Sequence, residues 1–355
     1  MRVLILLSLL GLAFATEDVF LNFAKEFNKS YKDGKDLISR RAIFMNNYEK
    51  MVKHNERYEA GLESWAQKVH EDMDLTSAEW MSKRTGGLPL YDEKTEFVDT
   101  LDERIVAKLK EMKGTPREFS WTDSGAVTSV KNQAQCGSCA AFSVIGAVES
   151  CFNIQRGKVI DDLSEQHILD CAYNHQVSDE SGTWGAFGCD GAWPNAYVDW
   201  LMGKNYNQIE SAYPYTSGSS GQVGSCKASS NGAYTDAWVT GMYNVWYCKE
   251  SDMENLVMIN PVSTSLQATD NWGGYSHGVM DDRMCCDAAT DSSCIYNLNH
   301  AILVVGFGHD TASGLDYWLI KNSWGSRWGE SGYMKLKRGT GHCGVGSLHQ
   351  TIPHC

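Results

Sequence analysis

Residues 132–143 of this 355-residue chain read NQAQCGSCAAFS. Directly downstream, small and apolar side chains recur at helical spacing, namely Ala141, Val144, Ile145, Val148 and Phe152. This pattern predicts that a helix begins at or near Cys139. A helix N-terminus has free amide donors and the positive end of the helix dipole, and both favour the thiolate form of a cysteine. Cys139 is therefore a candidate nucleophile.

The two cysteines of this stretch, Cys136 and Cys139, are compatible with three kinds of site. A Cys-x-x-Cys pair can be a redox pair, half of a zinc site, or one disulfide-bonded cysteine beside a reactive one. A zinc site would need a second, closely spaced pair of ligands. The downstream candidates lack matching spacing; they are Cys285, Cys286, Cys294 and His300. We expect no metal and no cofactor.

Two later motifs separate these alternatives. Residues 299–308 (NHAILVVGFG) are typical of a buried strand that begins with His300. Residues 317–325 (YWLIKNSWG) are typical of a second strand that ends at Asn322 among aromatic side chains. A lone histidine is more often structural than catalytic. A cysteine at a helix start, followed along the chain by this histidine and this asparagine, instead favours cysteine protease chemistry.

The motifs closely resemble those of the papain-like cysteine proteases, in particular the cathepsin L branch, over essentially the whole chain. The matching segments are residues 133–143, 163–166 (LSEQ), 299–308, 322–325 (NSWG) and 328–329. The resemblance implies an α+β fold of two domains behind a helical propeptide. The left domain would be helical around Cys139, and the right domain would be β-barrel-like and carry His300 and Asn322. The groove between the domains would bind substrate.

The resemblance also implies a role for each residue of the site. Cys139 would be the nucleophile and His300 the general base and later the general acid, as a thiolate–imidazolium pair. Asn322 would orient the imidazole, and Trp324 would shield that hydrogen bond from water. Gln133 would donate its side-chain amide to the developing oxyanion, together with the backbone N–H of Cys139.

A hydrophobic second subsite is implied for the substrate groove. The residues at its matching positions are Trp193, Pro194, Leu298, Ala301 and Leu348. Gly191 and Trp324 are expected to contact substrate as well. Because Leu348 at the floor is apolar, we expect a preference for aliphatic or aromatic side chains two residues before the scissile bond. Arginine should be poorly tolerated there.

Three disulfides are implied by the same resemblance. They are Cys136–Cys189, Cys171–Cys226 and Cys294–Cys343. The five other cysteines are Cys151, Cys248, Cys285, Cys286 and Cys355. Because five is an odd number, we expect up to two further disulfides and one free or intermolecular thiol.

The first fifteen residues are typical of a secretory signal peptide. Arg2 precedes an apolar run at residues 3–12, and residues 13–15 read AFA, a small-residue cleavage pattern. A membrane anchor is the alternative, but the run is much shorter than the ~20 residues that span a bilayer. We expect delivery through the secretory pathway to the extracellular space, a gut lumen or a lysosome.

Residues 16–115 are expected to form an inhibitory propeptide, with the peptidase domain at residues 116–355. Aromatic side chains at spacings of three and four predict a short helix; they are Phe20, Phe23, Phe27 and Tyr31. A second, longer helix is predicted by Arg40, Phe44, Asn47, Met51 and Asn55. Its stripe includes polar residues, which suggests a surface that docks on another part of the protein. Arg40, Phe44, Asn47 and Asn55 also match the interspersed propeptide motif of the family. In a second propeptide motif only Asp74 survives. An ordinary helical domain is the alternative.

Composition limits the choice of partners. The formal net charge of −13 argues against nucleic acid or an anionic membrane surface as the main partner. We expect protein or peptide substrates, the propeptide as an intramolecular inhibitor, cystatin-like inhibitors, and a monomer without a membrane span.

Several positions depart from the family pattern. Ala140 stands where the family has Trp, and Ala192 stands where it has Gly, which would be strained if that position needs a positive φ. Extra residues at 174–188 and 271–299 are expected to be surface loops. Neither carries the adjacent histidines of a carboxydipeptidase-type loop, which favours an endopeptidase. The alternatives are a weakened or inactive homologue that acts as a binding or scaffold protein, and a Cys-rich extracellular module that borrows the fold.

Overall fold

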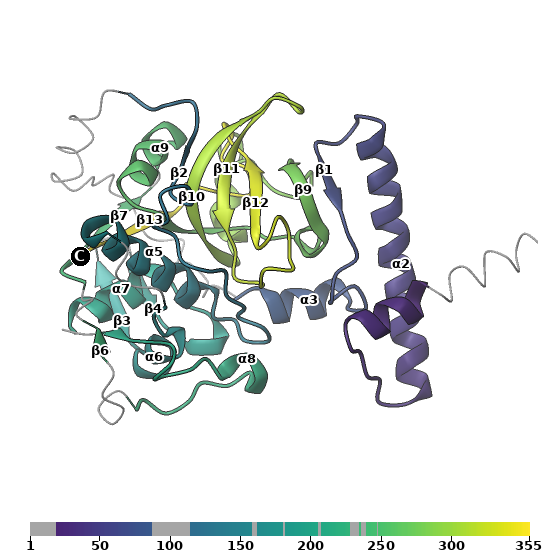
Figure 1. The fold of residues 1–355 in the computed structure, drawn as a ribbon, viewed down its shortest axis with the longest axis horizontal. Helices are drawn as coiled ribbons and strands as arrows, with labels where there is room; N and C mark the ends of the chain where they lie inside the picture. The colour runs from purple at the N-terminus through teal and green to yellow at the C-terminus, as the bar shows by residue number, and fades with distance from the viewer. Residues whose placement is uncertain are drawn as a thin grey trace, which may run out of the picture.

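The computed structural model describes residues 19–86, 114–157, 162–179, 182–204, 207–227, 234–235, 239–246 and 248–355. The expected signal peptide lies outside these residues. An N-terminal region (residues 19–86) packs against a sheet domain, and a helical domain lies on the other side of the sheet (Figure 1). Within the described residues, no helix is both long and apolar enough to cross a membrane.

The N-terminal region is a small helical unit with its own aromatic core. Residues 19–26 are helical, followed by α2 (Gly34–Glu59), β1 (Trp65–Gln67) and α3 (Ser77–Arg84). The side chain of Asp33 caps α2, and a Thr76–Glu79 capping box begins α3. The core residues are Phe20, Phe23, Phe44, Met51 and Met73. Phe27 and Tyr31 lie beyond the first helix but still pack against this core.

The polar residues in the stripe of α2 bind the segment that follows it. Asn47 donates to the carbonyls of Met73 and Leu75 at 3.0 and 3.1 Å. Asn55 exchanges two hydrogen bonds with the backbone of Gln67. The docking surface predicted on this helix is therefore used within the N-terminal region, where it positions β1 and α3.

The helical domain is built around α5 (Cys139–Arg156), which begins at Cys139 as the sequence predicts and is capped at its C-terminus by Gly157 with φ +71°. Its other elements are α6 (Glu165–Cys171), β3 (Gln176–Asp179), β4 (Gly182–Gly185), η1 (Gly188–Asp190), α7 (Pro194–Met202), β5 (Asn207–Gln208), α8 (Ser217–Ser220) and β6 (Tyr234–Thr235). The buried face of α5 packs against α6, α7 and strand β10.

The sheet domain contains one curved, nine-stranded sheet in the order β1-β9-β12-β11-β10-β8-β13-β7, with β2 paired to β10. Its strands are β2 (Phe119–Ser120), β7 (Gly241–Trp246), β8 (Val262–Leu266), β9 (Tyr275–Met280), β10 (His300–Asp310), β11 (Leu315–Lys321), β12 (Tyr333–Lys337) and β13 (His349–His354). Its helices are α9 (Glu250–Ile259), η2 (Asp270–Gly274) and η3 (Ser292–Asn297).

The N-terminal region supplies the edge strand of this sheet. Strand β1 pairs antiparallel with β9, where Trp65 lies opposite Gly278. Trp65 and Trp80 are buried in the same apolar cluster as the sheet domain's Trp272 and Trp324. The N-terminal region is thus bound by strand addition and by a shared core.

Both extra segments are more ordered than the sequence suggests. Residues 174–188 contain the hairpin β3–β4, and residues 271–299 contain β9, to which the N-terminal region binds. The expectation that both are surface loops is therefore wrong. The Asp, Ser and Gly content of these segments gave no strand signal, although β3 and β4 pair with each other and β9 pairs with the distant strands β1 and β12.

The described residues contain five disulfides, and one expected pairing is wrong. Cys136–Cys189 and Cys171–Cys226 occur as the resemblance implies. Cys294 bonds to Cys286 and Cys343 bonds to Cys285, in place of Cys294–Cys343. The extra segment at residues 271–299 contains the adjacent cysteines Cys285 and Cys286. Cys285 bonds to one member of the expected pair, and Cys286 bonds to the other. Cys151 and Cys355 form the fifth disulfide, while Cys139 and Cys248 keep their thiols.

Candidate active site

Cys139 is the first residue of α5 and lies completely buried between the two domains. The backbone N–H of Ala301 donates to its Sγ at 3.4 Å, so the thiol touches the start of β10. Burial raises the pKa of the Cys139 thiol, while the N–H groups of Ala301, Gly86 and Ala140 lower it in part. The net direction is upward, which keeps the thiol protonated in this state.

His300 opens β10 opposite Leu266 of β8 and is also completely buried. Its Nε2 donates to Oδ1 of Asn322 at 2.9 Å, and Trp324 stacks on its ring at a centroid distance of 4.8 Å. Burial lowers the pKa of His300 to about 4, although the hydrogen bond to Asn322 opposes this. The charged thiolate–imidazolium pair expected from the sequence is thus disfavoured while the site is covered.

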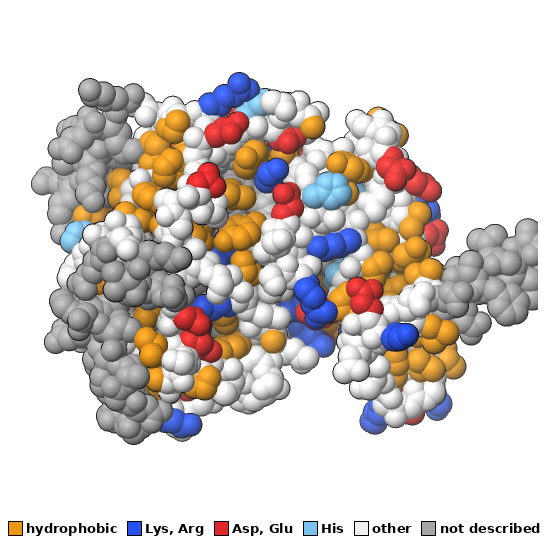
Figure 2. Space-filling view, viewed as in Figure 1, with side chains coloured by type: hydrophobic (Ala, Val, Ile, Leu, Met, Phe, Trp, Pro, Cys, Tyr) orange, Lys and Arg blue, Asp and Glu red, His pale blue; other side chains and the backbone are white. Residues whose placement is uncertain are grey.

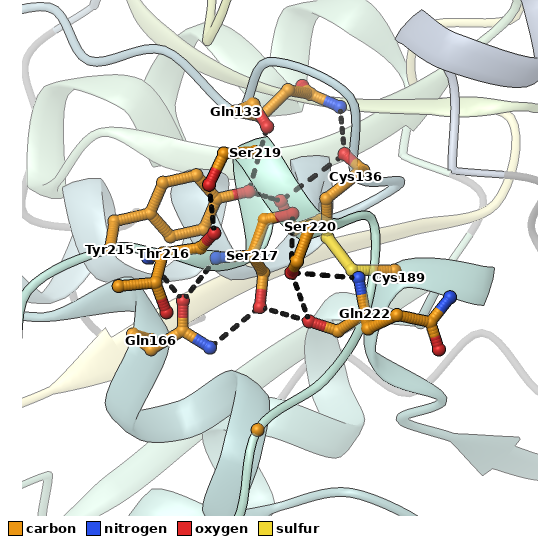
Figure 3. The surroundings of a disulfide bond; sticks show 12 residues. Gln133, Cys136, Gln166, Cys189, Tyr215, Thr216, Ser217, Ser219, Ser220 and Gln222 are labelled. Atoms are coloured by element: carbon orange, nitrogen blue, oxygen red, sulfur yellow. Dashed lines mark hydrogen bonds between the residues drawn. A yellow bond between two sulfur atoms is a disulfide. The ribbon is translucent and has the colours of Figure 1, made fainter.

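Gln133 lies completely buried in the loop before Cys139 (Figure 3). Its Nε2 donates to the carbonyls of Cys136 at 3.0 Å and of Arg84 at 3.4 Å. Its Oε1 accepts from the hydroxyl of Ser323 at 2.6 Å, which fixes the orientation of the amide. The hydroxyl of Tyr215 donates to the backbone carbonyl of Gln133 at 2.8 Å, beside the Cys136–Cys189 disulfide.

The N-terminal region covers this site at the end of α3. The carbonyl of Arg84 accepts from Gln133 and, at 3.2 Å, from Nε1 of Trp324. A Cβ added at Gly86 would lie 3.1 Å from Sγ of Cys139 and 2.4 Å from the carbonyl oxygen of Gly137. Only glycine fits this approach without displacing backbone. Gly86 was not predicted from the sequence, where its signal is a glycine soon after an amphipathic helix.

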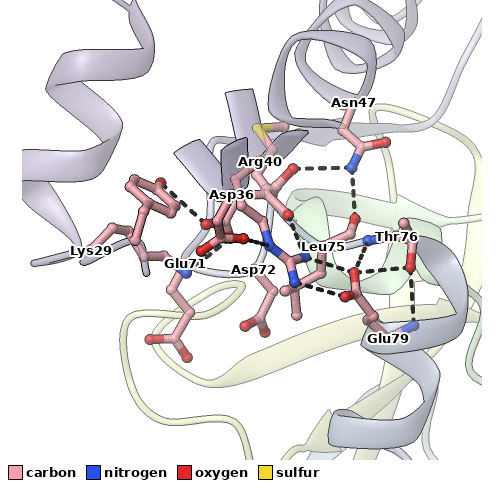
Figure 4. A network of polar contacts seen from close by, with 12 residues as sticks. Lys29, Asp36, Arg40, Asn47, Glu71, Asp72, Leu75, Thr76 and Glu79 are labelled. Carbon is pink, nitrogen blue, oxygen red and sulfur yellow. Dashed lines mark hydrogen bonds and ion pairs between the residues drawn. The ribbon is translucent and has the colours of Figure 1, made fainter. Parts of the chain in front are cut away.

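Ion pairs brace the covering segment. The guanidinium of Arg84 pairs with the carboxylates of Glu71 and Asp72. A second network joins Arg40 of α2 to both carboxylate oxygens of Glu79, at 2.7 and 2.8 Å (Figure 4). Asp74, the surviving residue of the second propeptide motif, pairs with Lys29 at 2.9 Å. The end of α3 is thereby held over Cys139.

A recess marks the boundary between the N-terminal region and the sheet domain (Figure 2). Trp80 of α3 packs edge-on against Trp324, with ring centroids 5.4 Å apart. Lys68 donates to the carbonyl of Gly329 at 2.8 Å. Trp324 therefore contacts both His300 and the covering helix.

A buried ion cluster that was not predicted from the sequence lies beside the site. Nζ of Lys131 is 3.0 Å from Glu149 and 2.7 Å from Glu165, the glutamate of the LSEQ motif. Burial raises the pKa of Glu165 to about 8, against the opposing charge of Lys131. The cluster joins the loop before Cys139 to α5 and α6.

The structure groups only part of the expected subsite. Trp193, Leu298 and Leu348 form one buried cluster, and Trp184 joins them. Ala301 belongs to the cluster around Cys139. Pro194 begins α7, and Gly191 has φ +101°. Trp324 lies over His300.

Ala140 and Ala192, which depart from the family pattern, are both buried in the helical domain. Ala192 is absent from the positions of positive φ among the described residues, so the strain considered for it does not arise. Ala140 is buried in the helical core.

Across the described residues, one group of side chains could offer metal ligands. It consists of Cys285, His342 and Cys343, and a disulfide joins its two cysteines. That group does not offer two thiolates.

Comparisons with known proteins show which proteins the chain is similar to. A model described as papain family cysteine protease matches residues 115–352, and one described as cathepsin propeptide inhibitor domain matches residues 20–80. A cathepsin L-like proteinase of Fasciola hepatica is 32% identical, covering 98% of this chain and 97% of its own length. Fruit bromelain of Ananas comosus is 34% identical, covering 92% and 83%. The solved digestive procathepsin L2 of Tenebrio molitor larval midgut has a TM-score of 0.80 at 31% identity, covering 96% of this chain and 100% of its own.

Proposed function

This chain belongs to the papain family of cysteine proteases and carries a cathepsin propeptide inhibitor domain, and we propose that Cys139 and His300 are its catalytic pair. It is a cysteine endopeptidase made as a zymogen. The proposal is supported by the order Cys139, His300 and Asn322 along the chain and by their placement together between the two domains.

The proposed reaction has two steps. His300 takes the proton of the Cys139 thiol, and Sγ attacks the substrate carbonyl. The amide of Gln133 and the backbone N–H of Cys139 stabilise the oxyanion, and His300 then protonates the leaving amine. In the second step His300 activates a water that hydrolyses the thioester. Asn322 accepts the Nε2–H of His300, which leaves Nδ1 to exchange protons with Sγ.

The observation that carries this proposal is the carbonyl of Arg84. Nε2 of Gln133 donates to this carbonyl, while Gly86 lies against Sγ of Cys139. A stretch of polypeptide with a carbonyl at the Gln133 amide is therefore already bound across the nucleophile. A substrate peptide would place its scissile carbonyl near the same donor.

The N-terminal region keeps the enzyme latent by three effects. It excludes substrate, it occupies the Gln133 amide, and its burial of the site opposes ionisation of both catalytic residues. Its removal would expose Cys139 and His300 and restore the ion pair. We place the signal peptide at residues 1–15, the propeptide at residues 16–115 and the peptidase at residues 116–355.

Specificity, location and partners follow as further parts of the proposal. The apolar cluster of Trp193, Leu298 and Leu348 favours a hydrophobic residue two positions before the scissile bond.

Five disulfides suit a protein made in the secretory pathway and delivered outside the cell, to a gut lumen or to a lysosome. We propose that the mature enzyme is a monomer and is open to cystatin-like inhibitors.

Labelling with an irreversible epoxide inhibitor of papain-like enzymes tests the function. The full-length chain, activated at mildly acidic pH with reductant, should be labelled at Cys139 and should lose activity in proportion. The Cys139→Ser chain, processed by added wild-type enzyme, is the matched control and should remain unlabelled. A correctly processed wild-type chain that is neither labelled nor active would favour the inactive, binding homologue.

A further inference from the structure

The extra segment at residues 174–188 is attached to the edge of the substrate groove. The backbone N–H of Trp193 donates to the carbonyl oxygen of Gly185 at 3.0 Å. The backbone N–H of Phe187 donates to the carbonyl oxygen of Gly191 at 2.9 Å. His175 at the base of the hairpin contacts Asp199 of α7 at 2.7 Å. The hairpin β3–β4 is therefore fixed in place relative to residues 191–193.

This attachment leaves one edge of residues 191–193 for substrate. Ala186 lies opposite Ala192, and the two hydrogen bonds of this antiparallel bridge are made by the neighbours on either side. In such a pair, the N–H and C=O of the central residue point away from the partner strand. The backbone of Ala192 is thus directed away from the hairpin, towards the side on which a substrate backbone can pair.

The hairpin inserts a large side chain into the expected second subsite. Trp184 is 2% exposed and belongs to one apolar cluster with Trp193, Leu298 and Leu348. Its ring meets that of Trp193 edge-on, with centroids 5.1 Å apart. On the same face of the hairpin, Val177 lies opposite Trp184 and packs against this cluster. Three of the five residues expected to line the subsite, Trp193, Leu298 and Leu348, therefore have an indole packed among them.

We propose that Trp184 is a specificity-determining residue, which narrows the second subsite to small aliphatic side chains such as Val and Ala. This inference rests on the proposed function, because it takes the position of the subsite from it. The hairpin changes which peptides bind and leaves the chemical step unaltered.

The size of the effect follows from packing. A Trp side chain buries roughly 150–250 Å² and cannot share its space with a substrate Phe or Leu. Differences of one methylene in an apolar pocket change kcat/KM by roughly 10–200-fold. Trp184→Ala should open space in the pocket and shift the preference towards large side chains.

The test uses a peptide series that differs only two residues before the scissile bond, with Ala, Val, Leu or Phe. For the activated wild-type enzyme, we expect kcat/KM for Val to exceed that for Phe by about tenfold or more. Trp184→Ala should raise the Phe-to-Val ratio at least about tenfold, and Trp184→Leu should lie between. Ser178→Ala, on the exposed face of the same hairpin, should leave the ratio unchanged. Titration with the epoxide corrects each rate for the active fraction.

Two outcomes overturn the inference. One is a wild-type preference for Phe or Leu, and the other is a Phe-to-Val ratio that Trp184→Ala leaves unchanged. If the wild-type chain hydrolyses no peptide, the proposed function fails and binding decides this inference separately. Dissociation constants are then measured on Cys139→Ser and Cys139→Ser/Trp184→Ala chains, with the propeptide removed by an added protease. If the Cys139→Ser chain binds the Val peptide more tightly than the Phe peptide and the double variant loses this difference, the inference is supported. If the order of the dissociation constants is the same in both chains, the inference is overturned.

Discussion

The side-chain amide of Gln133 donates a hydrogen bond to the backbone carbonyl of Arg84, with 3.4 Å between Nε2 and O. Nε1 of Trp324 donates to the same oxygen at 3.2 Å. One carbonyl of the propeptide thus uses a donor that we assign to the oxyanion of the reaction. Inhibition and catalysis therefore share the amide of Gln133, and a change at this residue should affect both.

Replacing Gln133 by Ala should lower kcat by about 10²–10³-fold, because one oxyanion donor is lost. The measurement is steady-state hydrolysis of a peptide substrate, corrected for active sites with the epoxide inhibitor. Gln135→Ala is the matched control, since Gln135 is exposed in the same loop. Equal losses in the two variants would show that the loop, and not the amide, is responsible.

Gly86→Ala should weaken inhibition by the propeptide. The added Cβ would lie 2.4 Å from the carbonyl oxygen of Gly137, and overpacking of this kind costs about 1–3 kcal/mol. The precursor should process itself faster, and at a higher pH, than the wild type. Gly34→Ala provides the control, because a Cβ there meets no atom within 4 Å. Unchanged processing of Gly86→Ala would contradict the close approach to Cys139.

The pH dependence of activation should depend in part on His70. Burial lowers the pKa of His70 from 6.5 to about 4, with Asp72 and Asp74 opposing this shift and Arg84 and Lys29 reinforcing it. The bound propeptide therefore disfavours protonated His70, so its binding weakens as pH falls from 6.5 towards 4. For one group the slope is at most one logarithmic unit per pH unit.

His70→Gln removes this titration and should flatten the pH dependence of precursor processing over that interval. The measured quantity is the rate of propeptide release between pH 7 and pH 4. The control is the mature enzyme, whose own pH profile should be unchanged because the substitution lies in the released segment. A processing profile identical to the wild type would remove His70 from the mechanism.

In the precursor, Cys139 should react slowly with a small alkylating agent. The raised pKa of the thiol and the lowered pKa of His300 both favour the neutral pair while the propeptide is bound. After activation the alkylation rate at neutral pH should rise, because the exposed pair can ionise. Rapid stopped-flow alkylation of the intact precursor would argue against this account.

Cys294→Ser should release the thiol of Cys286. The structure pairs these two cysteines, whereas the pairing expected from the family pattern would release Cys343. Alkylation under denaturing, non-reducing conditions followed by peptide mass spectrometry identifies the new thiol. Cys226→Ser, which should expose Cys171, calibrates the labelling.

Much of the secondary structure around the site was predicted from local patterns of side chains in the sequence. The start of α5 at Cys139 is visible as a periodicity of apolar side chains, and the strand that begins at His300 is visible as an apolar run. The long helix α2 is visible as a stripe of apolar and polar side chains at helical spacing. The polar residues of α2 signalled a docking face, and they bind the backbone of residues 67–75. The pairing of Cys294 could not be derived from local patterns, because five further cysteines without an assigned partner allow many disulfide connectivities.

The order of residues along the chain was sufficient to recognise the family, the catalytic candidates and an inhibitory N-terminal region, because each depends on short motifs and on helix or strand periodicity. Three properties needed the folded chain. Gly86 lies against Cys139, Trp184 packs in one cluster with Leu298 and Leu348, and burial opposes ionisation of the Cys139–His300 pair. All three arise from contacts between segments far apart in sequence, and such contacts leave no periodic trace in either segment.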